Sequence, residues 1–102
     1  MSGNEPAVTV YTRPGCPYCM MLRRGLNKAG LAYREVDIWQ DPQAAAFVRS
    51  VAGGNETVPT VDVAGHAMVN PSAAKVLGAV AARAPQQMPD QTRRRPWWHR
   101  RG

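Results

Sequence analysis

The two cysteines of this chain, Cys16 and Cys19, are separated by two residues, and they constrain the fold more than any other feature. A run at residues 7–11 precedes them, and a segment with helical periodicity follows. Residues 7–11 are apolar and β-branched almost throughout, which predicts a strand buried on both faces. A strand that turns into a helix, with Cys-x-x-Cys at the turn, is typical of a redox motif.

Pro17 predicts where the helix begins. Proline is favoured at the first helical position because its φ angle suits the helix and its missing N–H is not needed there. Cys16 is then the N-cap, and its sulfur faces the free N–H groups of Tyr18 and Cys19 at the positive end of the helix dipole. We expect the pKa of Cys16 to fall below the ~8.5 of free cysteine, towards about 3.5–7.5. A nearby Arg13 cation would lower it further.

Cys19 lies one turn into the predicted helix, and we expect its sulfur to be more buried. Cys16 is the predicted nucleophile, while Cys19 resolves a mixed disulfide or takes no part. Zinc needs four ligands, and the histidines, His66 and His99, are single and distant, so no metal site is predicted within one chain. A metal shared between two chains stays open. A structural disulfide across so small a loop would stabilise little.

Length and composition fit one small domain, because 102 residues with 44% hydrophobic content can form a single core. The chain has no run of ~18 apolar residues that could span a membrane, and residues 1–6 lack the features of a secretory signal. We therefore expect a cytoplasmic protein. Thiols are kept reduced in that compartment, so a Cys-x-x-Cys pair there is more often catalytic than structural.

The remaining pattern predicts the order β-α-β-α-β-β-α. Each helix is expected to begin with a proline that follows a capping residue, as in Asp41-Pro42 and Asn70-Pro71. The first strand–helix–strand connection favours a parallel, right-handed unit. The order is that of an α/β, thioredoxin-like fold, a four-stranded mixed sheet flanked by three helices, at residues 7–83. The predicted strands are residues 7–11, 31–38, 57–63 and 67–69, and the predicted helices begin at Pro17, Pro42 and Pro71.

With these elements in place, the chain resembles a glutaredoxin. Cys16-Pro17-Tyr18-Cys19 matches the active-site motif of that family. Thr57-Val58-Pro59 matches its second signature, in which a cis proline faces the cysteines. The resemblance covers about residues 6–82, and its nearest match is the mycoredoxin type of actinobacteria. The stretches that support this match are residues 35–38, 44–48, 53–61 and 70–73.

Two features depart from the family pattern. Glutathione-using glutaredoxins usually carry a Gly-Gly pair and an acidic residue before the last helix, where this chain has Val69-Asn70-Pro71-Ser72. The resemblance therefore implies mycothiol rather than glutathione as the low-molecular-weight thiol, and it implies no bound cofactor. Pro17 stands where mycoredoxins typically have glycine, so the start of the helix and the redox potential are expected to differ from theirs.

The resemblance also implies a substrate site around Cys16. A cis Pro59 would turn the backbone of Val58 towards an extended thiol compound, which could pair with it like a short strand; composition alone predicts an ordinary trans proline. Tyr18 would pack against the small thiol. Arg13 would stabilise the thiolate, bind an anionic group, or simply be solvated. The full predicted set of substrate-binding residues is Arg13, Pro17, Tyr18, Thr57, Val58, Pro59, Asn70 and Ser72.

The predicted activity is the reduction of mixed disulfides between proteins and a small thiol. One rival is a thioredoxin-like dithiol reductant of protein disulfides, which is recycled by a flavoprotein reductase and needs Cys19. A second rival is a dimer that holds an iron–sulfur cluster through Cys16 of each chain and two small thiols. Pro17 stiffens the loop and argues against this dimer, so we expect a monomer.

Residues 84–102 differ in composition from the predicted domain. Residues 83–102 hold six arginines and one acid, and the segment contains the run 93–101 with Trp97 and Trp98. Such a segment cannot bury enough apolar surface to order itself, so we predict a disordered tail and a flexible N-terminus at residues 1–6. Arginine with tandem tryptophan is able to bind nucleic acid or an anionic membrane, but a solvated tail, or one partly docked on the domain, is the preferred interpretation. Trp39 is predicted to be a packing or rim residue, and His66 to be solvated.

Overall fold

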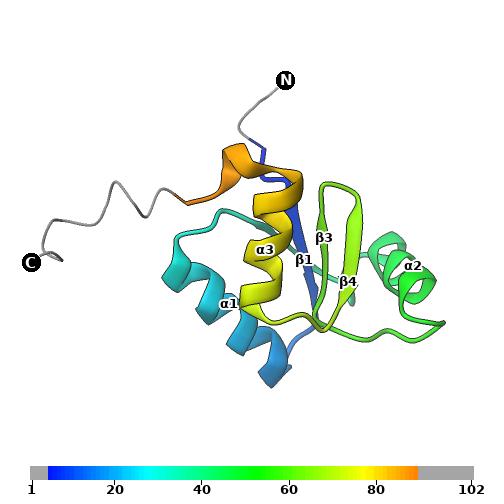
Figure 1. Cartoon of the computed structure of the whole chain (residues 1–102). Coiled ribbons are helices and arrows are strands. Elements are labelled where there is room, and N and C mark those ends of the chain that lie inside the picture. The colour runs from blue at the N-terminus through cyan, green and yellow to red at the C-terminus, as the bar shows by residue number, and fades with distance from the viewer. Residues whose placement is uncertain (1–4, 90–102) are drawn as a thin grey trace, which may run out of the picture.

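The computed structural model describes residues 5–89 of the chain. Its elements follow the predicted order, with a short 3-10 turn added at the end (Figure 1). The predictions for residues 1–4 and for the arginine–tryptophan run lie outside the described residues. The elements are β1 (Val8–Thr12), α1 (Pro17–Ala29), β2 (Arg34–Asp37), α2 (Pro42–Val51), β3 (Thr60–Val63), β4 (His66–Val69), α3 (Ala73–Arg83) and η1 (Pro85–Gln87).

The four strands form one mixed sheet in the order β2-β1-β3-β4. β1 pairs with β2 in parallel, as the first strand–helix–strand unit predicts, and β3 pairs antiparallel with both β1 and β4. Figure 1 shows α1 and α3 side by side on one face of the sheet and α2 on the other. The predicted three-helix, four-stranded architecture is therefore confirmed.

Two apolar clusters hold the layers together. The larger one joins the sheet to α1 and α3 and includes Leu22, Leu26 and Val80. The smaller one joins α2 to the end of the sheet, and it contains both Cys16 and Cys19. Both cysteines are therefore packed against apolar side chains, which limits how far their sulfur atoms can move relative to the sheet.

The three helices begin in two different ways. α1 and α2 start at a proline after the capping residues Cys16 and Asp41, as predicted. The prediction for the third helix is wrong: α3 begins at Ala73, and its N-cap is Ser72, whose hydroxyl accepts from the N–H of Lys75 at 3.1 Å. The reason is that the backbone of Asn70 is still hydrogen-bonded to the segment that leads into β3. Its φ angle is +53°, and its N–H donates to the carbonyl of Pro59 at 2.8 Å.

The predicted second strand begins too early. Leu31 still belongs to the end of α1, because its N–H bonds to the carbonyl of Leu26 beyond the left-handed Gly30. This is a usual helix-terminating pattern, in which glycine adopts a positive φ angle without a steric penalty. Only Arg34–Asp37 then pairs with β1.

The first part of the predicted tail packs against the domain. Ala84 is buried, and the side-chain amide of Gln87 accepts from the N–H of Ala7 at 2.7 Å and donates to the carbonyl of Glu5 at 2.8 Å. Residues 84–87 thus tie the C-terminal end of α3 to the start of β1. The packed part of the chain extends past residue 83, where the sequence pattern places its boundary.

Candidate active site

Cys16 lies at the point where the chain leaves β1 and enters α1. The loop turns through Gly15, whose φ angle of +74° suits glycine, and Cys16 is extended at φ −98°. Its Sγ accepts a hydrogen bond from the N–H of Cys19 at 3.3 Å. Pro17 has no N–H to offer, so the donors at this helix end come from the residues that follow it. The geometry matches the N-cap arrangement predicted from the sequence.

The environment of Cys16 lowers its pKa. Burial is the largest single effect and raises the pKa, but it is outweighed by hydrogen bonds from Cys19 and from the backbone of Tyr18, together with the charge of Arg13. Hydrogen bonds to a thiolate stabilise the charged form, which is why they act against burial. Cys16 therefore carries the more acidic thiol of the pair.

Cys19 shows the opposite shift. Burial and the hydrogen bond with Cys16 raise the pKa of Cys19 to about 12. Its residue surface is 1% exposed, compared with 5% for Cys16, so the predicted difference in burial is confirmed. The pair accordingly holds one thiol whose ionised form is favoured and one that stays protonated at neutral pH.

The cis proline predicted by the resemblance is present. The Val58–Pro59 bond is cis, and both residues are buried. The thiol of Cys16 donates to the Val58 carbonyl at a sulfur–oxygen distance of 3.8 Å. Residues 58 and 59, although 42 and 43 positions away in the sequence, therefore border the first cysteine.

Five of the predicted substrate-binding residues line one groove beside the cysteine turn: Arg13, Tyr18, Thr57, Val58 and Asn70. A second groove adjoins it and contains Ser72 and Met21, and Tyr18 and Asn70 line both grooves. Pro17 and Pro59 line neither of them. Pro17 begins α1, and Pro59 lies buried beneath the turn.

Asn55 and Glu56 also line the first groove, and sequence reasoning did not identify them. The carbonyl of Glu56 accepts from Nη1 of Arg13 at 3.3 Å, and its carboxylate pairs with Arg49 at 2.6 Å. The loop thus holds Arg13 beside the groove. The signal that could have found these residues is their place directly before Thr57, the first residue of the second signature.

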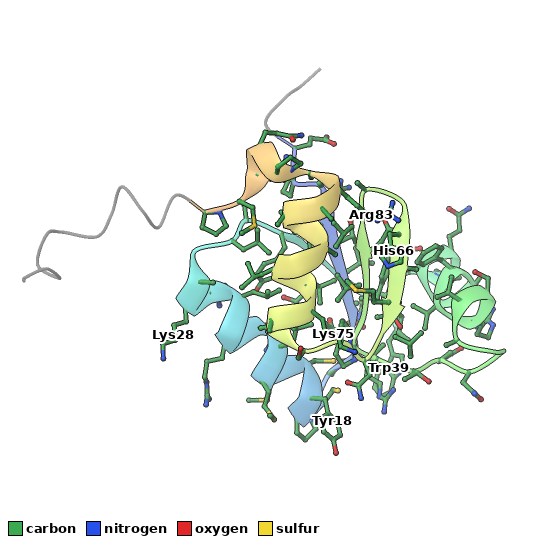
Figure 2. The ribbon with its side chains drawn as sticks, in the orientation of Figure 1. Tyr18, Lys28, Trp39, His66, Lys75 and Arg83 are labelled. Atoms are coloured by element: carbon green, nitrogen blue, oxygen red, sulfur yellow. The ribbon has the colours of Figure 1, made fainter. Side chains whose placement is uncertain are left out.

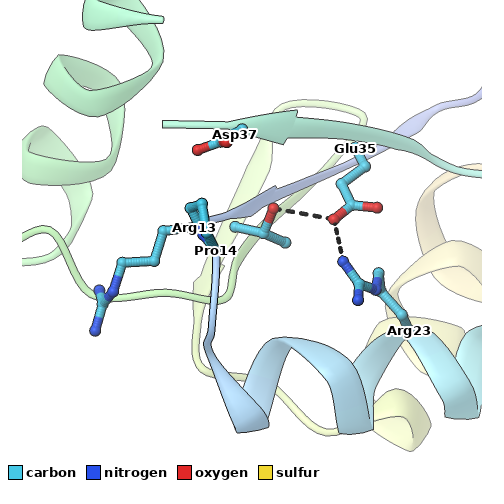
Figure 3. Close-up of a pocket in the computed structure, with 6 residues that line it drawn as sticks. Arg13, Pro14, Arg23, Glu35 and Asp37 are labelled. Carbon is cyan, nitrogen blue, oxygen red and sulfur yellow. Dashed lines mark hydrogen bonds and ion pairs between the residues drawn. The ribbon is translucent and has the colours of Figure 1, made fainter. Parts of the chain in front are cut away.

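A polar pocket borders the same turn towards β2 (Figure 3). Glu35 accepts hydrogen bonds from Thr12 at 3.0 Å and from Arg23 at 2.5 Å. Asp37 and Pro14 complete the lining, and the side chain of Arg13 extends away from this ion pair. Among residues 5–89 no group of three or more histidine, cysteine or acidic side chains is placed to hold a metal ion.

None of the helices in the described part of the chain is long and apolar enough to cross a membrane.

Comparison with known proteins places this geometry in a family. Residues 8–68 match the family model named Glutaredoxin. A Mycobacterium tuberculosis protein named for the glutaredoxin family is 51% identical over 71 residues, which are 69% of this chain and 84% of that one. Mycoredoxin 1 of Corynebacterium glutamicum is 42% identical over 78 residues, which are 76% of this chain and 96% of that one.

A solved structure agrees with this assignment. NrdH-redoxin of Escherichia coli, described as glutaredoxin-like with a thioredoxin-like activity profile, superimposes with a TM-score of 0.54 at 26% identity. The match covers 61% of this chain and 79% of that one. The chain belongs to the glutaredoxin family, is similar to its mycoredoxin type, and is a thiol–disulfide oxidoreductase.

Proposed function

We propose that this protein reduces mixed disulfides between proteins and the small thiol mycothiol. The thiolate of Cys16 attacks the sulfur of the small thiol, the bond to the protein sulfur breaks, and the protein leaves as a thiolate that takes a proton from water. A second small-thiol molecule then attacks the Cys16 mixed disulfide. This step returns Cys16 as a thiolate and releases the disulfide of two small thiols.

The observation that carries the proposal is that the pKa values of the two cysteines are shifted in opposite directions. The pKa of Cys16 is lowered, whereas the pKa of Cys19 is raised to about 12. A thiolate is the attacking species in exchange, and a low-pKa thiol also leaves easily. Cys16 therefore suits both the attack and the later release, and the protonated Cys19 competes weakly for the mixed disulfide.

The groove next to Cys16 is where we place the small-thiol half of the substrate. The Val58 backbone borders the Cys16 sulfur, and Arg13, Tyr18 and Asn70 supply a cation, an aromatic ring and an amide around it. Thr57 lines the groove, and Ser72 lines the one that adjoins it. In this scheme Pro17 and Pro59 shape the site through the backbone, since neither lines the grooves.

The choice of mycothiol is supported by two observations. This chain has Val69-Asn70-Pro71-Ser72 where glutathione-using glutaredoxins usually carry a Gly-Gly pair and an acidic residue. Mycoredoxin 1 is among the relatives, with 42% identity over nearly its whole length. We also propose that the protein acts as a monomer in the cytoplasm, and that a flavoprotein reductase regenerates the small thiol.

One single-cysteine protein, converted to its mixed disulfide with mycothiol and separately with glutathione, tests the proposal. We expect the wild-type protein to reduce the mycothiol form with the higher kcat/KM. Equal or faster reduction of the glutathione form would contradict the choice of thiol. Failure with both forms would contradict mixed-disulfide reduction itself.

A second candidate is a thioredoxin-like dithiol reductant of protein disulfides. It is favoured by the similarity to NrdH-redoxin, whose described activity profile is thioredoxin-like. This function requires Cys19, so Cys19→Ser should abolish reduction of an intramolecular protein disulfide. The same variant should retain reduction of the mixed disulfide if the first proposal is correct. The cluster-bridged dimer is the alternative that Pro17 argues against, and visible absorbance after anaerobic purification would revive it.

A further inference from the structure

Large exposed hydrophobic side chains gather around the cysteine turn. Residues 5–89 expose six of them, and five belong to the turn, to α1 directly after it, or to segments that border it. The sixth, Met88, follows η1 near the other end of the sheet. Exposed apolar side chains that cluster in this way mark interaction sites in soluble proteins. The five are Tyr18, Met20, Met21, Trp39 and Val69.

Trp39 lies in the turn after β2, next to the cysteine loop. The N–H of its neighbour Ile38 donates to the carbonyl of Thr12 at 2.9 Å, and Ile38 packs in the cluster that contains both cysteines. The backbone of Trp39 is fixed by a hydrogen bond to Asp37 at 2.9 Å. Its surface is 64% exposed, so of the two predicted roles, packing or rim, the exposure fits the rim. Figure 2 shows Trp39 and Tyr18 at the same end of the molecule.

Met20 extends this surface along α1. It shares a helix stripe with Arg23 and Asn27, three and seven residues later, and these contact Glu35 and Tyr33 on the β2 side. Arg23 and Asp37 line the polar pocket shown in Figure 3. Met20 lies three residues before Arg23 and Trp39 two residues after Asp37, and we call Met20, Trp39 and that pocket the β2-side surface. It borders the cysteine turn on the β2 side, whereas the groove is walled by residues 55–58 and 70 on the β3–β4 side, and Arg13 lines both.

We infer that the β2-side surface binds the protein half of the mixed disulfide, with Trp39 as its main docking residue. The inference rests on the proposed function and adds the kind of partner it needs: a chain with an apolar residue close to its modified cysteine. In disulfide exchange the attacked sulfur stands between the nucleophile and the leaving sulfur. The small-thiol half occupies the groove, so the protein half has to contact surface beside the turn that lies outside both grooves, as exposed Trp39 and Met20 do.

Tryptophan is suited to this role for two physical reasons. It offers a large rigid apolar area at low conformational cost, and tryptophan is enriched among residues that dominate binding energy at protein interfaces. The hydrogen bond to Asp37 already orders the backbone of Trp39 before a partner binds. The Arg23–Glu35 ion pair in the adjacent pocket can form hydrogen bonds with polar groups of the partner, as polar residues do at the rim of protein interfaces.

The test compares three mixed disulfides of the same small thiol. Two are short peptides that carry leucine or serine beside the modified cysteine, and the third joins the small thiol to 2-mercaptoethanol. For Trp39→Ala we expect kcat/KM to fall about tenfold with the leucine peptide. It should change less than twofold with the 2-mercaptoethanol compound. Trp39→Phe should restore most of the activity on the leucine peptide.

Met88→Ala is the matched control, because it removes an exposed apolar side chain from the other end of the sheet. It should leave all three rates unchanged. An equal loss on all three substrates for Trp39→Ala, or no loss on any, would overturn the inference while wild-type turnover kept the proposed function intact. A wild-type protein that reduced none of the three would refute the proposed function, and the docking role with it.

Discussion

The two ends of the sheet are closed in different ways. At the end of β1 that leads to Cys16, grooves, an ion-paired pocket and exposed apolar side chains surround one acidic thiol. At the other end, the amide of Gln87 joins residues 5 and 7 to η1, and Ala84 fills the core. The comparison shows that this small domain keeps its reactive cysteine and its terminal packing at opposite ends of the sheet. The first end is open to substrates, while contacts at the second end stabilise the fold.

The largest expected effect is the loss of activity at the first end. Cys16→Ser should abolish mixed-disulfide reduction, because a hydroxyl at this position supplies no thiolate nucleophile. The melting temperature should stay close to that of the wild type, since serine is also a good N-cap. Turnover with one mixed-disulfide substrate, measured beside thermal unfolding, checks both expectations. Full turnover by this variant would show that the two ends are not divided in this way.

The converse change removes the closure at the second end. A chain that stops at residue 83 loses buried Ala84 and both hydrogen bonds of Gln87. We expect the free energy of unfolding to fall by about 2–3 kcal/mol, from lost burial and lost hydrogen bonds. Denaturant unfolding of this chain, beside one that stops at residue 89, measures the loss.

The chain that stops at residue 89 is the control, because it keeps the docked turn and removes only the residues beyond it. It should unfold like the full chain. Its turnover should also equal that of the full chain if the arginine–tryptophan run has no part in catalysis. Equal stability of the two shortened chains would show that η1 does not close the domain.

The pH dependence of alkylation sharpens the contrast within the first end. The pKa of Cys16 is lowered, so its reaction with iodoacetamide should reach half its maximal rate at a pH below the usual range of a cysteine thiol. Cys19, with a pKa of about 12, should react only as the pH approaches that value. Mass spectrometry of the two sites over a pH series separates them. A Cys16 that titrated like a free thiol would contradict the helix-end account.

The same shifts predict how stability varies with pH. For Cys16 the folded-state pKa lies below the unfolded value, so its contribution is present above the unfolded pKa and is lost as the pH falls through the folded pKa. For Cys19 the folded value is the higher one, so its contribution is present below the unfolded pKa and is lost as the pH rises towards about 12. Cys19→Ser should therefore flatten the loss of stability at alkaline pH.

Local chemistry made the first end predictable and the second end hard to predict. The cap at Cys16 follows from a proline two residues before Cys19, and the sheet order follows from short apolar runs. The docking of Gln87 depends on two hydrogen bonds to residues 80 or more positions away, and nothing in the composition of the tail indicates them. The local pattern Asn70-Pro71 predicts the wrong start of α3 for a related reason, since the hairpin contact of Asn70 to Pro59 overrides the capping pattern.

The smallest expected effect tests that corrected helix start. Ser72→Ala removes the hydroxyl that accepts from the Lys75 N–H and should cost about 1 kcal/mol of unfolding free energy. Asn70→Gly should be neutral or slightly stabilising, because glycine adopts the φ angle of +53° found there without strain. If Asn70 were instead the N-cap, Asn70→Ala would carry the capping loss and Ser72→Ala would be nearly silent. Denaturant unfolding of the three variants distinguishes the two arrangements, because a side chain can supply the missing acceptor only from the residue directly before the helix.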